Sequence, residues 1–263
     1  MRKPLISAVL TTHREGLILG ATLKSIARSI ALAEVNRQPV ELLVSLDRAD
    51  ALTRDIVMDF AERMETKIFE NDFGDPGLSR NRCIENASGE FVAILDGDDL
   101  ISNNWLSDAA TTAGRDTRPT IWHPEVNVVF GEHTHMFRHI DTEDDEFDPL
   151  MLIATNPWTA LSFARKSCFE ALPYTPTRLA SGVGFEDWAW NRDAVAAGYL
   201  HKVVKNTGHA IRRKAISVVK LTNQAKALPA PTEFFRAELE KRAALRASRD
   251  HRRMFLEPSL SVA

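Results

Sequence analysis

The sequence predicts an α/β fold in which a mostly parallel sheet is covered by helices on both faces. Short apolar runs alternate with segments of helical periodicity through the first hundred residues. Fully apolar, β-branched runs are typical of parallel strands, and amphipathic segments between them are typical of crossover helices. Polar clusters follow the strands directly, where ligands bind in sheets of this kind.

The first half alternates strands and helices in strict order. Leu17, Leu23 and Ile26 recur at helical spacing, and Pro39 resets the chain before the next apolar run. Gly89 ends the third helical segment, and the apolar run after it leads directly into an Asp-rich turn. Strands are expected at 5–10, 40–46, 67–69 and 91–95, and helices at 17–35, 55–64 and 78–86.

The second half is less regular. Gly131 separates two strand-like runs, 120–129 and 132–140, which we expect to form a hairpin. Gly198 ends an amphipathic helix at 186–197. Further helices are expected at 105–113 and 167–172, further strands at 158–164 and 201–204, and a charged, Ala-rich helical tail from about residue 229.

Length and composition narrow the class of protein. A chain of 263 residues with 44% hydrophobic residues can bury a sizeable core. The two cysteines, Cys83 and Cys168, are isolated, which predicts a reducing compartment and no zinc ribbon. A net charge of −3 argues against general nucleic-acid binding. The N-terminus lacks the pattern of a signal peptide, so the expected location is the cytoplasm.

An Asp-rich turn follows the strand at 91–95. Asp96, Asp98 and Asp99 lie within four residues, and three carboxylates this close repel one another unless a cation neutralises them. Mg²⁺ and Mn²⁺ prefer oxygen ligands and commonly bridge carboxylates to phosphates. A solvated turn without a ligand is the alternative.

Two further polar residues lie near this turn in the predicted fold. The planar guanidinium of Arg80 suits a diphosphate or a nucleobase edge, although a helix-surface role is the commoner one for an arginine. Asp47, after the second strand, suits a ribose hydroxyl or a base N–H, with a helix N-cap as the alternative.

The order of these motifs resembles the family 2 glycosyltransferases of the GT-A fold. The most specific block is GLSRNRCIENASGEFVAILDGDD at 77–99, and SAVLTTHRE, VSLD and GFEDWAWNRD match in the same order. The resemblance covers roughly residues 5–220, and 107–150 match weakly. In place of the family's Pro-Thr-Tyr-Asn turn, this chain has Thr-Thr-His-Arg, and only Asp47 remains of the acidic run after the second strand.

The resemblance implies a Rossmann-like nucleotide-binding sheet and a specific chemistry. A sugar would pass from a nucleotide-diphosphate-sugar donor, most commonly a UDP-sugar, to a hydroxyl of a carbohydrate or lipid-linked glycan in polysaccharide biosynthesis, with inversion. Mn²⁺ or Mg²⁺ at a DXD motif would assist the leaving nucleotide, with Asp99 the first choice of ligand. By resemblance, the nucleotide-binding residues are Thr11, His13, Glu15, Asp47, Arg80, Asp96 and Asp98, and the metal ligands are Asp98, Asp99 and His209.

A second acidic pair, Glu186 and Asp187, opens the helix at 186–197. Acidic residues favour the first turn of any helix, because the helix dipole is positive there. The resemblance implies a further role, since the family places its catalytic base at such a pair. We expect Asp187 to be the base that takes the acceptor's proton, with Glu186 as the alternate.

The predicted organisation has three parts. A nucleotide-sugar-binding half (1–106) precedes an acceptor-binding and catalytic half (107–228) and a helical tail (229–263). Six Lys or Arg and one Asp lie within 241–253, so the tail is expected to contact an anionic membrane surface, at the inner face for a cytoplasmic protein. Packing on the domain or on a partner in a homodimer is the alternative.

Two other functions stay open at this level. A catalytically silent sugar-nucleotide-binding module would keep the same motifs. A metal-dependent phosphohydrolase would use the Asp cluster, although Leu100 stands where such enzymes of the haloacid-dehalogenase type need Thr or Val. His133, His135 and His139 carry no recognisable metal signature, because neither a carboxylate nor a cysteine completes a ligand set.

Overall fold

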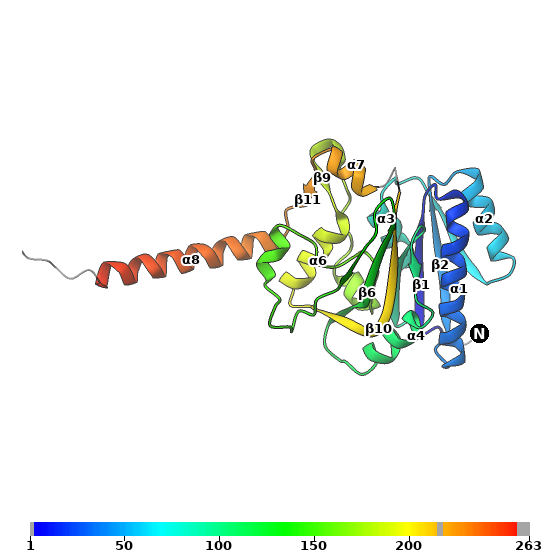
Figure 1. The fold of residues 1–263 in the computed structure, drawn as a ribbon, viewed down its shortest axis with the longest axis horizontal. Coiled ribbons are helices and arrows are strands. Elements are labelled where there is room, and N and C mark those ends of the chain that lie inside the picture. The colour runs from blue at the N-terminus through cyan, green and yellow to red at the C-terminus, as the bar shows by residue number, and fades with distance from the viewer. Residues whose placement is uncertain (1–2, 215–217, 257–263) are drawn as a thin grey trace, which may run out of the picture.

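The computed structural model describes residues 3–214 and 218–256, and one large mixed sheet forms its centre (Figure 1). Within those residues the sheet has nine strands in the order β3-β2-β1-β4-β8-β6-β10-β5, and β7 pairs with β6. The strands are β1 (Ile6–Thr12), β2 (Val40–Asp47), β3 (Thr66–Asn71), β4 (Phe91–Asp96), β5 (Leu100–Ile101), β6 (Thr120–Gly131), β7 (His135–Arg138), β8 (Ser162–Arg165) and β10 (Leu200–Arg213).

The sheet is parallel in its first half and mixed in its second. β1 pairs in parallel with β2 and with β4, and β2 pairs in parallel with β3. β8 runs antiparallel to both β4 and β6, and it joins the two halves into one sheet. β6 and β10 are again parallel, so their carboxyl ends lie at one edge.

Helices cover both faces of the sheet, as the alternating sequence pattern predicts. Successive residues of a strand point to opposite faces. Ile6, Ala8 and Leu10 of β1 therefore join one apolar cluster, and Val9 joins the other. The helices are α1 (Leu19–Val35), α2 (Ala51–Ala61), α3 (Pro76–Glu85), α4 (Trp105–Ala113), α5 (Lys166–Ala171), α6 (Glu186–Ala196), α7 (Val218–Gln224) and α8 (Glu233–Leu256).

The segment Gly16–Val35, which contains α1, is the one helical segment among the described residues that is long and apolar enough to cross a membrane. The buried helix of a protein core meets the same criterion. Leu19, Leu23 and Ile26 of α1 are buried against the sheet in the first apolar cluster.

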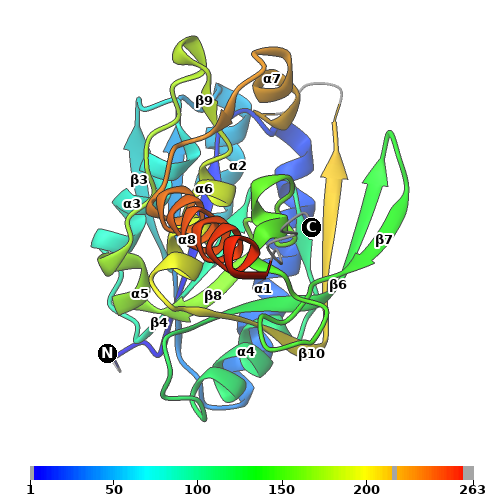
Figure 2. The same cartoon turned by 90° about the vertical axis from the view of Figure 1, so that its left-hand side faces the viewer.

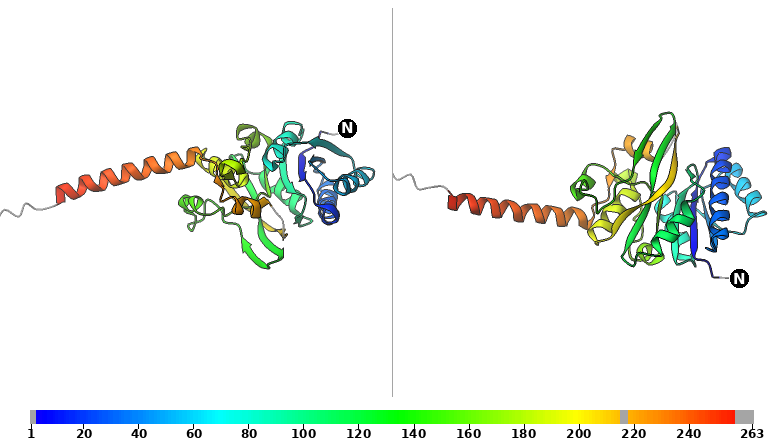
Figure 3. Two further views of the ribbon diagram at one scale, coloured as in Figure 1. Left: turned by 90° about the horizontal axis from the view of Figure 1, so that it is seen from above. Right: turned by 60° about the horizontal axis from the view of Figure 1, so that its bottom comes forward.

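The C-terminal helix α8 extends away from the rest of the molecule (Figures 1 and 3). Its first turn packs on the body, because Phe234 is buried in a small cluster with Leu152 and Trp158. Further along, Leu239 and Leu245 are 67% and 63% exposed. The expected helical tail is therefore present, and it contacts the body through its beginning.

Several element boundaries differ from the sequence expectation for identifiable reasons. The predicted hairpin is present as β6 and β7, which reach outward beside β10 in Figure 2. The strand expected at 201–204 continues to Arg213 as β10, because a bulge between Val204 and Gly208 lets it keep pairing with β6. The strand expected from 158 begins at Ser162, and the short β5 was not foreseen.

Candidate active site

The polar ends of the parallel strands meet at one edge of the sheet. The register of β1 and β4 places Thr11 beside Asp96. The Thr11 hydroxyl donates a hydrogen bond of 3.1 Å to Oδ1 of Asp96. A Cβ at Gly97 would lie 2.9 Å from the carbonyl oxygen of Thr11 and 3.2 Å from the Glu15 side chain. The turn after β4 therefore needs glycine at this position.

Asp47 lies at the end of β2 with its carboxylate turned into the protein. It is 5% exposed and accepts hydrogen bonds from the backbone N–H groups of Phe73, Gly74 and Asp75, at 2.8 to 2.9 Å. The Ser79 hydroxyl donates a fourth at 3.0 Å. A carboxylate has about four lone-pair sites, so these donors occupy it. Asp47 thus shapes the loop before α3, and its contact with a nucleotide stays a prediction.

His13 and Glu15 follow β1 at the surface end of the same edge. The backbone N–H of His13 donates to Glu15 at 2.6 Å, and the His13 ring nitrogen Nδ1 lies 2.6 Å from the carbonyl oxygen of Asp47. Burial raises the pKa of the Glu15 carboxyl, and the His13 N–H partly opposes that effect. The exposed ring of His13 is therefore held in place through its Nδ1 atom.

Arg80 on α3 bridges two carboxylates from distant parts of the chain. Its guanidinium lies 2.9 Å from Asp96 Oδ1 and 2.7 Å from Glu186 Oε1, and the residue is 2% exposed. Burial disfavours the charge of Arg80, but the two carboxylates outweigh it and raise its pKa well above the usual value. Burial alone would raise the pKa of Asp96, and the Arg80 charge and hydrogen bond lower it instead. The three side chains form a buried ion chain.

Strand β10 and the residue that follows it place basic side chains beside the Asp-rich turn. Lys214 Nζ lies 2.6 Å from Asp98 Oδ2, and His209 Nε2 lies 2.9 Å from Asp99 Oδ2. The backbone N–H of Arg212 donates to Asp99 Oδ1 at 2.9 Å. Burial, followed by the neighbouring charge of Asp99, raises the pKa of Asp98 to about 6. The Asp98 carboxyl thus loses solvation and faces a second carboxylate, and a cation at this turn would oppose both effects.

The chemistry of these ligands fits a divalent cation only in part. Among residues 3–214 and 218–256, no three His, Cys, Asp or Glu side chains are grouped so that they could hold a metal ion between them. Asp99 and His209 offer one carboxylate and one imidazole side by side, a pair that suits Mn²⁺. A metal bound there would need its remaining ligands from the diphosphate of a substrate or from water.

Asp187 and Glu186 open α6 in different environments. Glu186 is neutralised by Arg80, whereas Asp187 makes no ion pair with the described residues. Asn156 Nδ2 donates a hydrogen bond to Asp187 Oδ2 at 3.3 Å, and the backbone of Trp188 also bonds to this carboxyl. Burial, followed by the Glu186 charge, raises the pKa of Asp187 to about 7. A carboxylate of this kind can accept a proton near neutral pH.

The predicted site residues thus form three groups. His13 links Glu15 and Asp47 at the ends of β1 and β2. Thr11, Asp96, Arg80 and Glu186 are linked by direct contacts, and Asp187 is the next residue on α6. At the Asp-rich turn, Asp98 pairs with Lys214 and Asp99 with His209. Sequence reasoning missed Asn156 and Tyr174, whose ring packs 5.2 Å from the Arg80 guanidinium. Both lie in irregular segments, where periodicity gives no signal.

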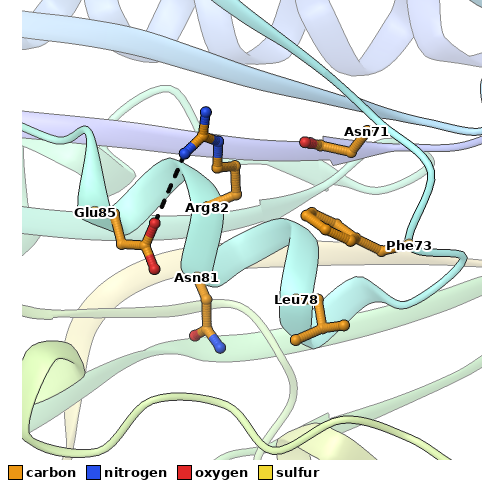
Figure 4. A pocket seen from close by; sticks show the side chains of 6 residues that line it. All are labelled: Asn71, Phe73, Leu78, Asn81, Arg82 and Glu85. Carbon is orange, nitrogen blue, oxygen red and sulfur yellow. Dashed lines mark ion pairs between the residues drawn. The ribbon is translucent and has the colours of Figure 1, made fainter.

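A pocket lies beside α3 (Figure 4). It is lined by Asn71, Phe73, Leu78, Asn81, Arg82 and Glu85, and Arg82 pairs with Glu85 at 3.9 Å. None of the predicted site residues lines it. The candidate site therefore consists of the residues at the strand ends and does not include this pocket.

Comparisons with known sequences point to one family. The family model described as glycosyl transferase family 2 matches residues 7–172. Poly(ribitol-phosphate) β-N-acetylglucosaminyltransferase TarS of Staphylococcus aureus is 33% identical over 84 residues, which are 31% of this chain and 15% of that protein. Validoxylamine A glucosyltransferase of Streptomyces hygroscopicus is 34% identical over 95 residues, 35% of this chain and 22% of that protein. The matched segments thus span a small part of both relatives.

Solved structures extend the similarity over most of the chain. The structure of S. aureus TarS 1–349 in complex with UDP-GlcNAc has a TM-score of 0.60 at 18% identity, covering 82% of this chain and 60% of that one. A mannosyltransferase from Pyrobaculum calidifontis in complex with GDP-Man and Mn²⁺ has a TM-score of 0.59 at 14% identity, covering 82% and 59%. At these identities the likeness shows the fold, a GT-A type sheet with a mostly parallel first half.

Proposed function

The chain belongs to glycosyltransferase family 2, and from this membership we propose that it transfers a sugar from a nucleoside-diphosphate sugar, most commonly a UDP-sugar, to a glycan hydroxyl with inversion. The observation that carries the proposal is Asp187, a carboxylate without an ion-pair partner among the described residues and with a pKa raised to about 7. It lies next to a carboxylate that Arg80 already neutralises. An inverting transfer needs one such base and no covalent enzyme intermediate.

The donor would lie at the carboxyl ends of β1, β2 and β4. Asp47 fixes the loop after β3, and Thr11 holds Asp96 in place at the neighbouring strand end. The nucleoside would lie at the ends of β1 and β2, and the diphosphate would lie toward β10. Solved relatives bound to UDP-GlcNAc and to GDP-Man support a nucleotide-sugar donor.

Positive charge from the protein would stabilise the departing nucleotide. Lys214 and the Arg212 side chain lie at the Asp-rich turn, and the Arg212 Nε donates to the carbonyl oxygen of Asp98 at 3.2 Å. As the bond between the sugar and the diphosphate breaks, its electron pair passes to the diphosphate oxygen. Fixed cations at that oxygen stabilise the charge as it develops.

Asp99 and His209 would hold a divalent cation, with Asp98 beside them. When bound, the ion would supply positive charge to the diphosphate of the donor. A solved structural relative contains Mn²⁺, which supports divalent metal use without fixing the ion as Mn²⁺ or Mg²⁺.

Asp187 would complete the transfer on the acceptor side. The acceptor oxygen forms a bond to the anomeric carbon while the bond to the diphosphate breaks. The proton of the acceptor hydroxyl passes to Asp187. Glu186 is the poorer base, because its charge is engaged by the Arg80 guanidinium at 2.7 Å.

Release of nucleoside diphosphate tests the proposal. The full chain is incubated with UDP-GlcNAc, UDP-glucose or GDP-mannose, with Mn²⁺ or with EDTA, and with or without a pool of glycan acceptors. We expect release from one donor to depend on the acceptor. Binding of a donor, seen as a thermal shift, without release under any condition would instead support a catalytically silent binding module.

We also propose a place for the protein in the cell. It would lie in the cytoplasm, peripheral to the inner face of the membrane, with α8 contacting anionic lipid. The exposed Leu239 and Leu245 and the basic residues of 241–253 support this contact. A homodimer that covers the same helix is the second candidate.

A further inference from the structure

Helix α3 attaches the segment before α6 to the donor side of the site. Asp75 caps α3 by accepting from Leu78 N at 2.9 Å, and its second oxygen accepts from Thr177 N at 2.6 Å. Asn81 exchanges two hydrogen bonds with the backbone of Tyr174, at 2.8 and 3.0 Å. The segment that leads into Glu186 and Asp187 is therefore held by two contacts from one helix.

The ion chain is the third and most buried of these attachments. Arg80 and Glu186 are 106 residues apart, and their exposed fractions are 2% and 8%. Tyr174 packs against the same guanidinium at 5.2 Å. The second terminal nitrogen of the Arg80 guanidinium contacts Asp96, whose side chain is 29% exposed at the strand edge. One buried side chain thus connects the donor edge to the start of α6.

We propose that Arg80 and Glu186 are positioning residues for the transfer, which hold the start of α6 against the donor edge and set the charge around Asp187. The proposal rests on the proposed function, in which Asp187 is the base. It also departs from the expectation that Arg80 contacts the nucleotide and that Glu186 is the alternate base. Both side chains are instead occupied with each other.

The charges around Asp187 predict that two substitutions shift its pKa in opposite directions. Glu186 on the same helix and Asp96 on β4 raise the pKa of Asp187, and Arg80 on α3 lowers it. Tyr174 lies in the same group, and burial raises its pKa above the usual range, so it stays neutral near pH 7. Neutralising Glu186 should therefore lower the pKa of Asp187, and neutralising Arg80 should raise it. A residue that only stabilised the fold would not produce opposite shifts.

Carboxyl titration by NMR measures these shifts directly. Aspartate ¹³C signals are followed against pH in the full chain, and Asp187→Asn identifies the signal of Asp187. Glu186→Gln should lower its pKa by at least about one unit, and Arg80→Gln should raise it by a similar amount. Arg80→Lys restores the charge and should return the pKa toward the wild-type value. Glu85→Gln on the outer side of α3 is the control and should change nothing.

The pH dependence of sugar transfer provides a second measurement. The acid limb of the kcat/KM profile should move in the same directions as the Asp187 signal. Should a single variant fail to fold, the double variant Arg80→Gln/Glu186→Gln removes both charges of the Arg80–Glu186 pair. Its Asp187 pKa should lie closer to the wild-type value than that of the single variant that folds. Shifts that are absent, or that share one sign, would overturn the positioning role.

The two proposals can fail separately. Opposite NMR shifts in a chain that transfers no sugar would support the ion chain and reject the transfer function. Normal transfer with an unshifted Asp187 signal in both variants would do the reverse.

Discussion

At the residue scale, the site contains three aspartates whose carboxylates face different partners. Asp96 is paired with Arg80, Asp98 with Lys214 and Asp99 with His209. Each aspartate therefore has one protein cation or imidazole beside it, which offsets the repulsion expected among the three carboxylates. Burial and the neighbouring charge of Asp99 nevertheless raise the pKa of Asp98, and a further cation at the turn would oppose both effects.

We expect donor binding to depend on a divalent metal, because a cation at the Asp-rich turn would oppose the repulsion between Asp98 and Asp99. Wild-type protein should bind a nucleoside-diphosphate sugar more tightly with Mn²⁺ than with EDTA, as measured by calorimetry. Asp99→Ala should abolish this difference, because it removes the carboxylate beside His209. Asp108→Ala, on the adjacent α4, is the control and should keep it. Equal donor binding by wild-type protein in Mn²⁺ and in EDTA would reject a metal role.

Asp187 also makes stability depend on pH. Its pKa rises from 3.8 to about 7 on folding, so the folded chain retains the proton over a range in which the unfolded chain has lost it. This contribution is complete below about pH 4 and is lost as the pH rises through 7. Asp187→Asn should therefore be more stable than wild type at pH 8, by on the order of 1–3 kcal/mol, and little different at pH 4.

Thermal unfolding at both pH values measures the effect, with Glu41→Gln as a control of opposite sign. Although burial opposes it, hydrogen bonds from Lys67 and Ser7 lower the pKa of Glu41. Glu41 therefore contributes stability above its unfolded pKa, which is lost as the pH falls. A destabilised Asp187→Asn at pH 8 would contradict the charge environment described for α6.

At the element scale, α3 serves two parts of the site at once. It begins at Pro76, a favoured first residue of a helix, after the cap Asp75. The same carboxylate that caps the helix also binds Thr177. Helix α3, which is short and polar in sequence, thus holds the segment that leads into α6.

Loss of this cap should loosen the approach to α6. Asp75→Ala removes the bonds to Leu78 N and Thr177 N, and it should cost roughly 1–2 kcal/mol of unfolding free energy. The segment 178–184 should also become more sensitive to limited proteolysis. Asp50→Ala, which removes the cap of α2, should cost a similar free energy without exposing that segment. Equal protection of 178–184 in both variants would contradict the role of Asp75 as a clamp.

The alternation of strands and helices was predictable because buried strands and amphipathic helices have different periods in the sequence. The positions of Asp47 and Asp96 at strand ends were predictable for the same reason. The partners of these side chains were not. Arg80 meets Glu186 across 106 residues, and His209 reaches Asp99 only because β10 continues past its bulge. Such pairings depend on strand order in the second half, which no local pattern specifies.

At the scale of the whole molecule, α8 extends away from the sheet and packs on the body through its beginning. Phe234 and Glu238 are buried at its beginning, whereas Leu239 and Leu245 are exposed. A chain cut after Glu240 should therefore keep its unfolding temperature. A chain cut after Pro229 also loses Phe234, which packs with Leu152 and Trp158, and it should unfold at a lower temperature.

The same two proteins test the lipid contact. The full chain should sediment with vesicles that contain phosphatidylglycerol and not with neutral phosphatidylcholine vesicles, because each Lys or Arg near an anionic surface contributes about 1 kcal/mol. The chain cut after Glu240 should sediment with neither. Retained binding by the cut chain would move the lipid contact to another surface. A concentration-dependent mass in the full chain alone, without vesicle binding, would favour a dimer through α8.

The central claim is that Asp187 accepts the proton of the acceptor, and sugar transfer by Asp187→Asn tests it most directly. The substitution keeps the size of the side chain and removes the proton acceptor. With the donor that wild-type protein uses, transfer should fall by at least ~10²-fold, while donor binding is unchanged. Asp193→Asn, six residues further along α6, should transfer at the wild-type rate. Near wild-type transfer by Asp187→Asn would contradict the account.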